Sequence, residues 1–221
     1  CHRLDPTRLT TFATCVDQTR YLGCSDLIAW NKYTGWKDAE TDAAKFFDNA
    51  RRNSGGTPVG VSEYGRGGST VQHADPLYYK EDDVPGTYHP EEYQAVCHEG
   101  YWRAIKERPW LWTKTVWQFS DMQSSIKDEG DTPGINDKGM VTYDRKTRKD
   151  AFYFYKANWN PQPMLHLCSK RFDRRKHPVT DIKAYTNLKE ATLYVNGKKI
   201  GPARPDDIRR AVWTRAATPY A

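Results

Sequence analysis

Residues 58–65 read PVGVSEYG, and this stretch decides the fold. A short apolar run that is rich in valine and bounded by proline and glycine is typical of a strand buried in a sheet. The run closes on a carboxylate, Glu63, and a carboxylate at such a position is costly unless it is paired or used. The pattern alone leaves two interpretations of Glu63 open, a functional group and a structural glutamate bonded to a neighbouring loop.

Similar apolar segments lie on both sides of this strand. We expect further strands at residues 9–13 (LTTFA), 27–31 (LIAWN) and 111–117 (LWTKTVW). Apolar residues at helical spacing predict helices over residues 38–52 and from residue 89 to about 105. Strands that alternate with helices predict parallel βα units, and hence an α/β fold. A complete eight-unit barrel takes about 250 residues, so four strands indicate a small open sheet or part of a barrel.

The pattern changes after residue 162. A last helix is expected over residues 149–158, and Pro161 and Pro163 then mark a boundary. Residues 179–185 and 191–195 read as strands, and the Asn196-Gly197 pair is a strong signal for a hairpin. We therefore expect two domains, an α/β domain over residues 1–162 and part of an antiparallel β-sandwich over residues 163–221.

Composition excludes several classes of protein. The net charge of the 221-residue chain is +6, but the basic runs at 145–149 and 170–177 are diluted by acids, so we expect a solvated surface and no nucleic-acid partner. The five cysteines form no CxxC pair and the histidines no HExxH motif, so we expect no metal and no cofactor. No apolar run is long enough for a membrane helix. The 8 tryptophans and 14 tyrosines are compatible with sugar-stacking surfaces as well as with large cores.

Polar and aromatic residues follow three of the predicted strands. The strand ends read NKYTGW at 31–36, SEYG at 62–65 and WQFSD at 117–121. Function collects at the carboxyl ends of strands in parallel α/β folds, so we expect these three segments to lie at one functional edge.

These three segments, in this order, resemble glycoside hydrolase family two, which includes β-galactosidases and β-glucuronidases. Residues 134–145 (GINDKGMVTYDR) and 149–159 (KDAFYFYKANW) look like the end of the same barrel. The segment from residue 163 onward is similar to the β-sandwich that follows the barrel in many bacterial β-galactosidases. The resemblance implies the C-terminal half of a (β/α)8 TIM barrel, strands five to eight, followed by part of an immunoglobulin-like sandwich.

The resemblance also implies roles for individual residues. Glu63 matches the catalytic nucleophile, and Tyr33 matches a tyrosine that hydrogen-bonds it. Asn31 and Trp117 match residues that shape the pocket for the sugar next to the scissile bond, with packing in the barrel core as the alternative for Trp117. For Trp36, a contact at the rim of the pocket and ordinary loop packing are equally compatible with the sequence.

The partner of the nucleophile is missing from the sequence. A retaining glycosidase needs two carboxyl groups, and in this family the acid/base is the glutamate of an Asn-Glu pair that ends an earlier barrel strand. No Asn-Glu pair occurs in the chain, so we expect this glutamate upstream of Cys1 and expect the isolated chain to be inactive.

The substrate is predicted to be a carbohydrate, with a terminal β-galactoside expected first. Asn136 and Lys138 have the Asn-x-Lys form that grips the substrate carboxylate in β-glucuronidases, so a β-glucuronide or β-galacturonide is the alternative. The structural alternative for Lys138 is that it simply caps a loop near the last helix. A non-catalytic carbohydrate-binding fragment is a further alternative. The sequence is compatible with an oligomer of the complete protein and does not decide it.

Overall fold

The computed structural model of the chain describes residues 1–16, 19–33, 39–75 and 86–217. The chain divides into two compact units. The first consists of residues 1–66 and 100–118, and the second of residues 67–99 and 119–221. The expected domain boundary near residue 162 lies inside the second unit and stays a prediction.

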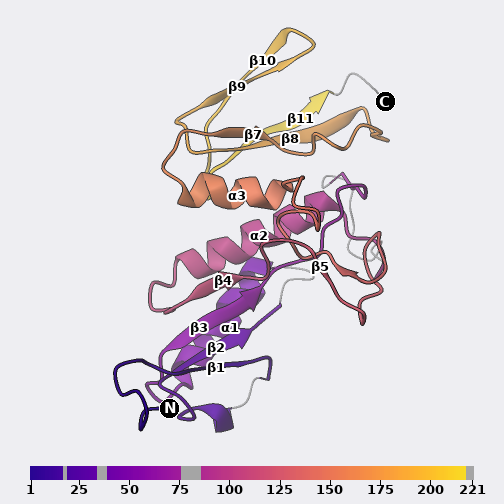
Figure 1. Cartoon of the computed structure of the whole chain (residues 1–221). Helices are drawn as coiled ribbons and strands as arrows, with labels where there is room; N and C mark the ends of the chain where they lie inside the picture. Colours follow the sequence, from indigo (N-terminus) through magenta and orange to yellow (C-terminus); the bar gives the residue numbers. More distant parts are fainter. Residues whose placement is uncertain (17–18, 34–38, 76–85, 218–221) are drawn as a thin grey trace. The chain divides into compact units, whose positions relative to one another are not determined.

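The first unit is built on one parallel sheet with the strand order β1-β2-β3-β4 (Figure 1). The 3₁₀ turn η1 lies between β1 and β2 in the sequence, α1 between β2 and β3, and α2 between β3 and β4. Only the part of α2 from Gly100 onward belongs to the first unit, and its residues up to Glu99 belong to the second. The bounds are β1 (Thr11–Thr14), η1 (Thr19–Tyr21), β2 (Leu27–Asn31), α1 (Ala39–Arg52), β3 (Val59–Tyr64), α2 (Glu91–Lys106) and β4 (Lys114–Val116). The prediction of parallel strands that alternate with helices is confirmed.

Burial of the central strands explains why these segments form a sheet. Ile28 and Ala29 of β2 and Val61 of β3 are almost completely enclosed, as is Phe47 of α1. β4 is shorter than the predicted strand and begins after Trp112, whose indole N–H donates to the carbonyl oxygen of Ile28 at 3.0 Å. The sheet therefore ends in a common row of strand ends that carries the predicted polar residues.

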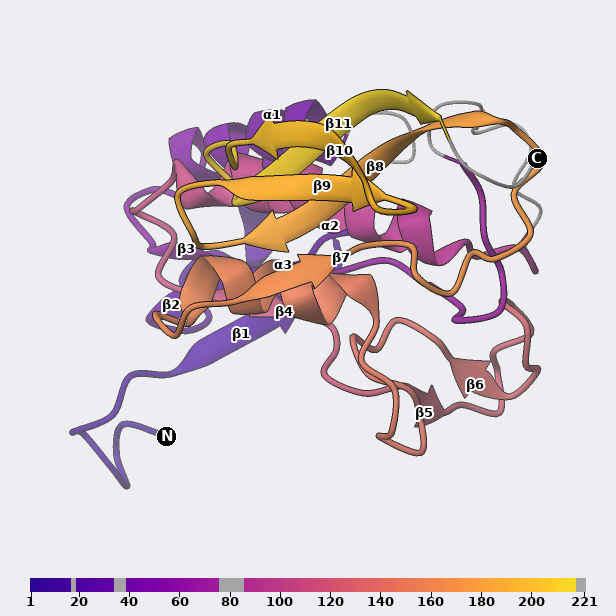
Figure 2. The ribbon, with the colours of Figure 1, turned by 90° about the horizontal axis from the view of Figure 1, so that it is seen from above.

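The second unit holds the rest of the chain as short strands, a helix and two antiparallel sheets (Figure 2). The sheets have the orders β11-β8-β7 and β10-β9, and a small ribbon pairs β5 with β6. The bounds are β5 (Met122–Gln123), β6 (Ile135–Asn136), α3 (Asp150–Trp159), β7 (Leu165–Leu167), β8 (Val179–Thr186), β9 (Ala191–Val195), β10 (Lys198–Ala203) and β11 (Arg210–Ala217).

The predicted hairpin joins β9 to β10. Asn196 and Gly197 have φ angles of 49° and 78°, the left-handed values that a two-residue turn of this kind requires. Leu193 of β9 packs in one apolar cluster with Ala184 of β8 and Trp213 of β11, so the two antiparallel sheets share a core. None of the described helices has the length and apolar character needed to cross a membrane.

The fully enclosed His98 of the second unit predicts a pH dependence of stability. Its Nδ1 lies 2.8 Å from the hydroxyl oxygen of Tyr155. Burial, and after it the charge of Lys149, lowers the pKa of His98 to about 3 from the ordinary value of 6.5. Between these two pH values the unfolded chain binds a proton that the folded chain excludes. The contribution of His98 to the free energy of unfolding is therefore complete above pH 6.5 and is lost as the pH falls.

We expect this residue to contribute a slope of about 1.4 kcal/mol per pH unit. The measurement compares urea unfolding of the wild-type protein with that of His98→Gln from pH 7 to pH 4. The variant cannot gain this proton, so the difference in unfolding free energy between the two proteins should change steadily over this range. A difference that stays constant with pH would contradict the burial of a neutral His98.

Candidate active site

Glu63 and Tyr33 meet at the carboxyl ends of two adjacent strands. The Tyr33 hydroxyl donates a hydrogen bond of 2.8 Å to Oε2 of Glu63. Burial, followed by this bond and the charge of Glu63, raises the pKa of Tyr33, so the phenol stays a proton donor. Among the residues that the structure describes, no hydrogen bond to the other carboxylate oxygen, Oε1, is found. Tyr33 thus orients the carboxylate through Oε2.

The predicted residue Asn31 lies in the same group. It is the last residue of β2 and pairs with Glu63 across the sheet. Its Oδ1 accepts a hydrogen bond of 2.7 Å from the hydroxyl of Ser62. The structure therefore brings together Asn31, Tyr33 and Glu63, as the sequence predicts.

Backbone bonds hold the neighbouring strand ends in register. The Glu63 carbonyl oxygen accepts the N–H of Lys32 at 2.8 Å, and the Tyr64 carbonyl oxygen accepts the N–H of Trp117 at 2.8 Å. Trp117 thus follows β4 directly beside the strand of Glu63. The role of its side chain at a sugar stays a prediction. Trp36 lies outside the described residues.

Tyr101 of α2 supports this edge of the sheet, although the sequence analysis assigned no functional role to it. Its ring stacks on that of Tyr64 with 4.4 Å between the centroids and an interplanar angle of 10°. Its hydroxyl donates a hydrogen bond of 2.8 Å to the carbonyl oxygen of Lys32, the residue between Asn31 and Tyr33. Tyr101 appears in the sequence only as part of the apolar face of a helix, which also carries core residues, so no local signal separates this role from packing.

The predicted clamp residues Asn136 and Lys138 lie next to each other in the second unit. Oδ1 of Asn136 accepts the backbone N–H of Lys138 at 3.2 Å, which fixes the turn between them. Nζ of Lys138 lies 3.4 Å from Oε1 of Glu129, and Lys127 binds the same oxygen at 2.7 Å. The loop of the motif is therefore ordered, and its lysine is paired with Glu129.

Asp137, the middle residue of the motif, anchors this loop. Its carboxylate binds His89 Nδ1 at 2.7 Å, and its carbonyl oxygen accepts a bond of 2.9 Å from Nζ of Lys149. A side chain at Gly67 or Gly130 would come within 2.5 Å of the Asp137 carboxylate, so both positions need glycine. No local sequence pattern indicates this role, because the partners of Asp137 lie 48 and 12 residues away.

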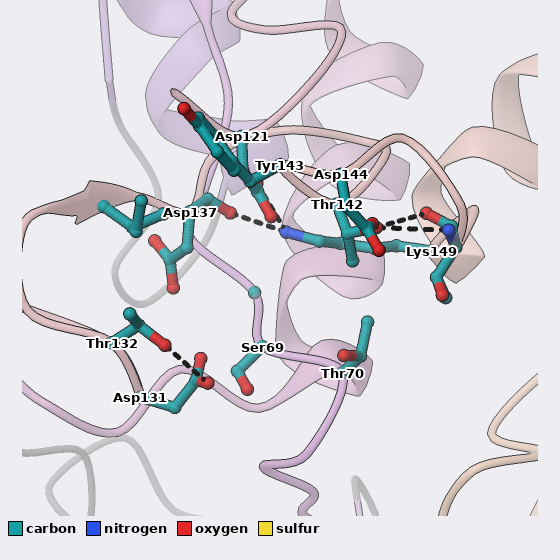
Figure 3. Close-up of a pocket in the computed structure, with 13 residues that line it drawn as sticks. Ser69, Thr70, Asp121, Asp131, Thr132, Asp137, Thr142, Tyr143, Asp144 and Lys149 are labelled. Atoms are coloured by element: carbon teal, nitrogen blue, oxygen red, sulfur yellow. Dashed lines mark hydrogen bonds and ion pairs between the residues drawn. The ribbon is translucent and has the colours of Figure 1, made fainter. Parts of the chain in front are cut away.

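A polar cavity of about 450 Å³ lies beside this anchor. Nζ of Lys149 donates to Oδ1 of Asp121 at 2.8 Å, and Figure 3 shows that the same Nζ also meets the carbonyl oxygen of Asp137. Burial raises the pKa of Asp121 to about 6, although the charge of Lys149 opposes this. The remaining lining is rich in hydroxyl and carboxylate groups and includes Ser69, Thr70, Asp131, Thr132, Thr142 and Asp144.

Asp150, His166 and Cys168 are buried together in the second unit, with one donor atom of each within 4.8 Å of the others. Oδ1 of Asp150 lies 2.7 Å from Nε2 of His166, and Oδ2 accepts the Ser169 N–H at 2.7 Å. Burial raises the pKa of the Cys168 thiol well above its usual value, and a thiol must lose its proton to bind a metal. These contacts account for the cluster, and we assign no metal to it.

The group at the ends of β2 and β3 has the parts of a nucleophilic site. It offers one oriented carboxylate, a phenol that donates to it and an amide from the adjacent strand. A carboxylate presented in this way can attack an electrophilic carbon or take a proton.

Comparison with known proteins shows which enzymes the chain resembles. No family model matches the chain. A β-glucuronidase of Bacteroides fragilis is 43% identical over 211 residues, which are 95% of this chain and 30% of that protein. An FMN-binding β-glucuronidase from Faecalibacterium prausnitzii has 35% identity and a TM-score of 0.85, and the match covers 99% of this chain and 33% of that one.

A further structure, a Bacteroides fragilis protein named provisionally as a β-galactosidase, has 25% identity and a TM-score of 0.86, over 98% of this chain and 33% of that one. The chain is therefore a relative of glycosidases over nearly its whole length. More particularly, the resemblance to the group that contains β-galactosidases and β-glucuronidases is confirmed. The chain spans about a third of the length of these relatives.

Proposed function

We propose that the chain carries the nucleophile of a retaining β-glycosidase, on the C-terminal half of a (β/α)8 barrel that a β-sandwich follows. The observation that carries this proposal is the bond of 2.8 Å between Tyr33 and Glu63 at adjacent strand ends. The four parallel strands and the antiparallel tail support the two-domain arrangement, with a boundary near residue 162.

The reaction follows from the chemistry of two carboxyl groups. Glu63 attacks the anomeric carbon and forms a covalent glycosyl-enzyme intermediate, while a second carboxylic acid protonates the leaving oxygen. The second group then removes a proton from water, which hydrolyses the intermediate with net retention of configuration. Tyr33 holds the carboxylate in the direction of attack, and Asn31 and Trp117 line the sugar pocket.

The second carboxyl group is predicted to lie outside this chain, so the 221-residue polypeptide alone should not turn over an aryl β-glycoside. Loss of the acid slows departure of the leaving group on the order of 10²–10⁴-fold, and part of the pocket is also lost. The measurement is the release of nitrophenol by the purified chain, with Glu63→Gln as the blank. Turnover by the chain that Glu63→Gln removes would contradict this expectation.

We propose a β-glucuronide as the substrate of the complete enzyme. Two observations favour it, namely the names of the relatives with 43% and 35% identity and the Asn136-x-Lys138 motif, whose lysine, here paired with Glu129, would exchange that carboxylate for the one on the sugar. The first expectation from the sequence, a β-galactoside, remains the second candidate. It is supported by the 25% identical relative that is named as a β-galactosidase.

Lys138→Ala separates the two substrates. A charge-assisted hydrogen bond contributes roughly 1.5–3 kcal/mol, so kcat/KM for nitrophenyl β-glucuronide should fall about 10- to 150-fold. The matched β-galactoside has no carboxylate for Lys138 to bind, so its kcat/KM should stay within about twofold of the wild-type value.

The matched control is Lys127→Ala, because Lys127 binds the same oxygen of Glu129 and lies outside the motif. It should leave both activities unchanged. Equal losses on the two substrates, or the same loss in the control variant, would contradict the assignment of Lys138. If the complete enzyme binds both sugars and cleaves neither, it is a carbohydrate-binding protein instead.

A further inference from the structure

Ser62, the residue before Glu63, is an extra residue in β3. In the pairing with β2, the consecutive residues Trp30 and Asn31 pair with Val61 and Glu63, so Ser62 has no partner in β2. In the pairing with β4, Val61 pairs with Lys114 and Tyr64 with Val116, so β3 has two residues between these pairs where β4 has one. β3 therefore carries an extra residue relative to both neighbours, and the pairing with β2 places it at Ser62. Bulges are rare between parallel strands, and they redirect a side chain next to many active sites.

The bulge gives Ser62 a partner in the candidate site. Its hydroxyl donates a hydrogen bond of 2.7 Å to Oδ1 of Asn31, the residue that pairs with Glu63. The amide oxygen is the acceptor of the Asn31 side chain, and its nitrogen carries two N–H donors. Oxygen and nitrogen lie on opposite sides of the amide carbon. A bond that holds the oxygen against Ser62 therefore also decides where the two donors point.

We propose that Ser62 is a positioning residue that fixes the Asn31 amide so that Asn31 presents its nitrogen to the sugar. Asn31 then donates to an oxygen of the substrate, a hydroxyl or a carboxylate oxygen, and cannot serve as an acceptor there. This inference rests on the proposed glycosidase function and adds to it the polarity of Asn31 and a role for Ser62. Without the hydroxyl, the amide is free to rotate, and the wrong orientation places an acceptor against the substrate oxygen.

The test uses three substitutions of Ser62 in the complete enzyme. Ser62→Thr keeps a hydroxyl. Ser62→Val has the shape of threonine but no hydroxyl, and Ser62→Ala removes the hydroxyl and adds no bulk. We expect kcat/KM for an aryl β-glycoside to fall about tenfold in Ser62→Val and Ser62→Ala, and Ser62→Thr to recover most of the loss. Ser54→Ala is the control, because Ser54 is a buried serine just after α1 whose hydroxyl donates to the carbonyl oxygen of Arg51.

A second measurement separates positioning from general support of the fold. If Ser62 acts through Asn31, then Ser62→Ala in an Asn31→Ala background should cost no further activity, within about twofold. Thermal melting of each variant shows whether the fold is kept. Equal activities of Ser62→Thr and Ser62→Val, or the same loss from Ser62→Ala in both backgrounds, would overturn the inference.

The proposed function fails separately from this inference. A wild-type enzyme without turnover on any aryl β-glycoside would remove the proposed function, and the role of Ser62 with it. A wild-type enzyme that loses its turnover in Glu63→Gln but is indifferent to Ser62 would keep the glycosidase and overturn only the positioning role.

Discussion

Glu63→Gln should abolish turnover in the complete enzyme. The variant keeps the size of the side chain and a hydrogen-bond acceptor for Tyr33, but an amide cannot form the glycosyl-enzyme bond. We expect kcat to fall on the order of 10⁴–10⁶-fold, the range seen when an enzyme loses its covalent nucleophile. The measurement is the steady-state release of nitrophenol from matched β-glucuronide and β-galactoside substrates.

Two companion variants sharpen this result. Glu107→Gln removes an exposed carboxylate that pairs only weakly with Lys106, at 3.6 Å, and should leave kcat unchanged. Glu63→Ala opens a space beside the anomeric carbon, and added azide should restore turnover and yield the α-glycosyl azide. A Glu63→Gln enzyme with more than about a hundredth of the wild-type kcat would exclude Glu63 as the nucleophile.

Glu99→Ala should cause the largest loss of stability. Glu99 is almost completely enclosed in the second unit, where its carboxylate binds Nζ of Lys183 and the hydroxyl of Tyr185, and lies 3.0 Å from Nη1 of Arg210. Burial raises the pKa of Glu99, but the charges of Lys183 and Arg210 outweigh it, and the pKa lies below its usual value. Removal of one partner from a buried ion pair costs about 3–5 kcal/mol, because the other charge stays buried without compensation.

The control for this prediction is Glu190→Ala, which removes an exposed partner of Arg204 at 3.6 Å. An exposed pair of this kind contributes at most about 1 kcal/mol, so its urea-unfolding midpoint should hardly move. The measurement is urea unfolding of both variants and the wild-type protein. Equal midpoints for Glu99→Ala and Glu190→Ala would show that the buried network does not support the fold.

The parallel sheet could be predicted because its strands carry their own signals. Apolar runs such as residues 27–31 and 58–64 predict strands from the local sequence alone, and the Asn196-Gly197 pair likewise predicts its hairpin. The convergence of Asn31, Tyr33 and Glu63 was also predictable, because parallel strands end at the same edge.

Other parts of the site depend on contacts that no local pattern encodes. The bulge at Ser62 exists only relative to the neighbouring strands β2 and β4. Asp137 reads as the unremarked middle residue of a motif, yet it anchors the loop through His89, 48 residues away. Lys149 reads as an exposed lysine at a helix start and is in fact buried against Asp121. Only the folded structure brings the partners of such long-range polar pairs together, so the local sequence pattern cannot predict them.

The central expectation is that Glu63 forms a covalent bond to the sugar. A 2-deoxy-2-fluoro β-glucuronosyl or β-galactosyl fluoride should trap that bond, because the fluorine destabilises the oxocarbenium-like transition state and the good leaving group lets the intermediate accumulate. After peptic digestion of the complete enzyme, mass spectrometry should find the sugar on the peptide that contains residues 62–65, attached to Glu63. A sugar attached to any other residue, or an active enzyme that hydrolyses these probes with inversion and without an adduct, would contradict it.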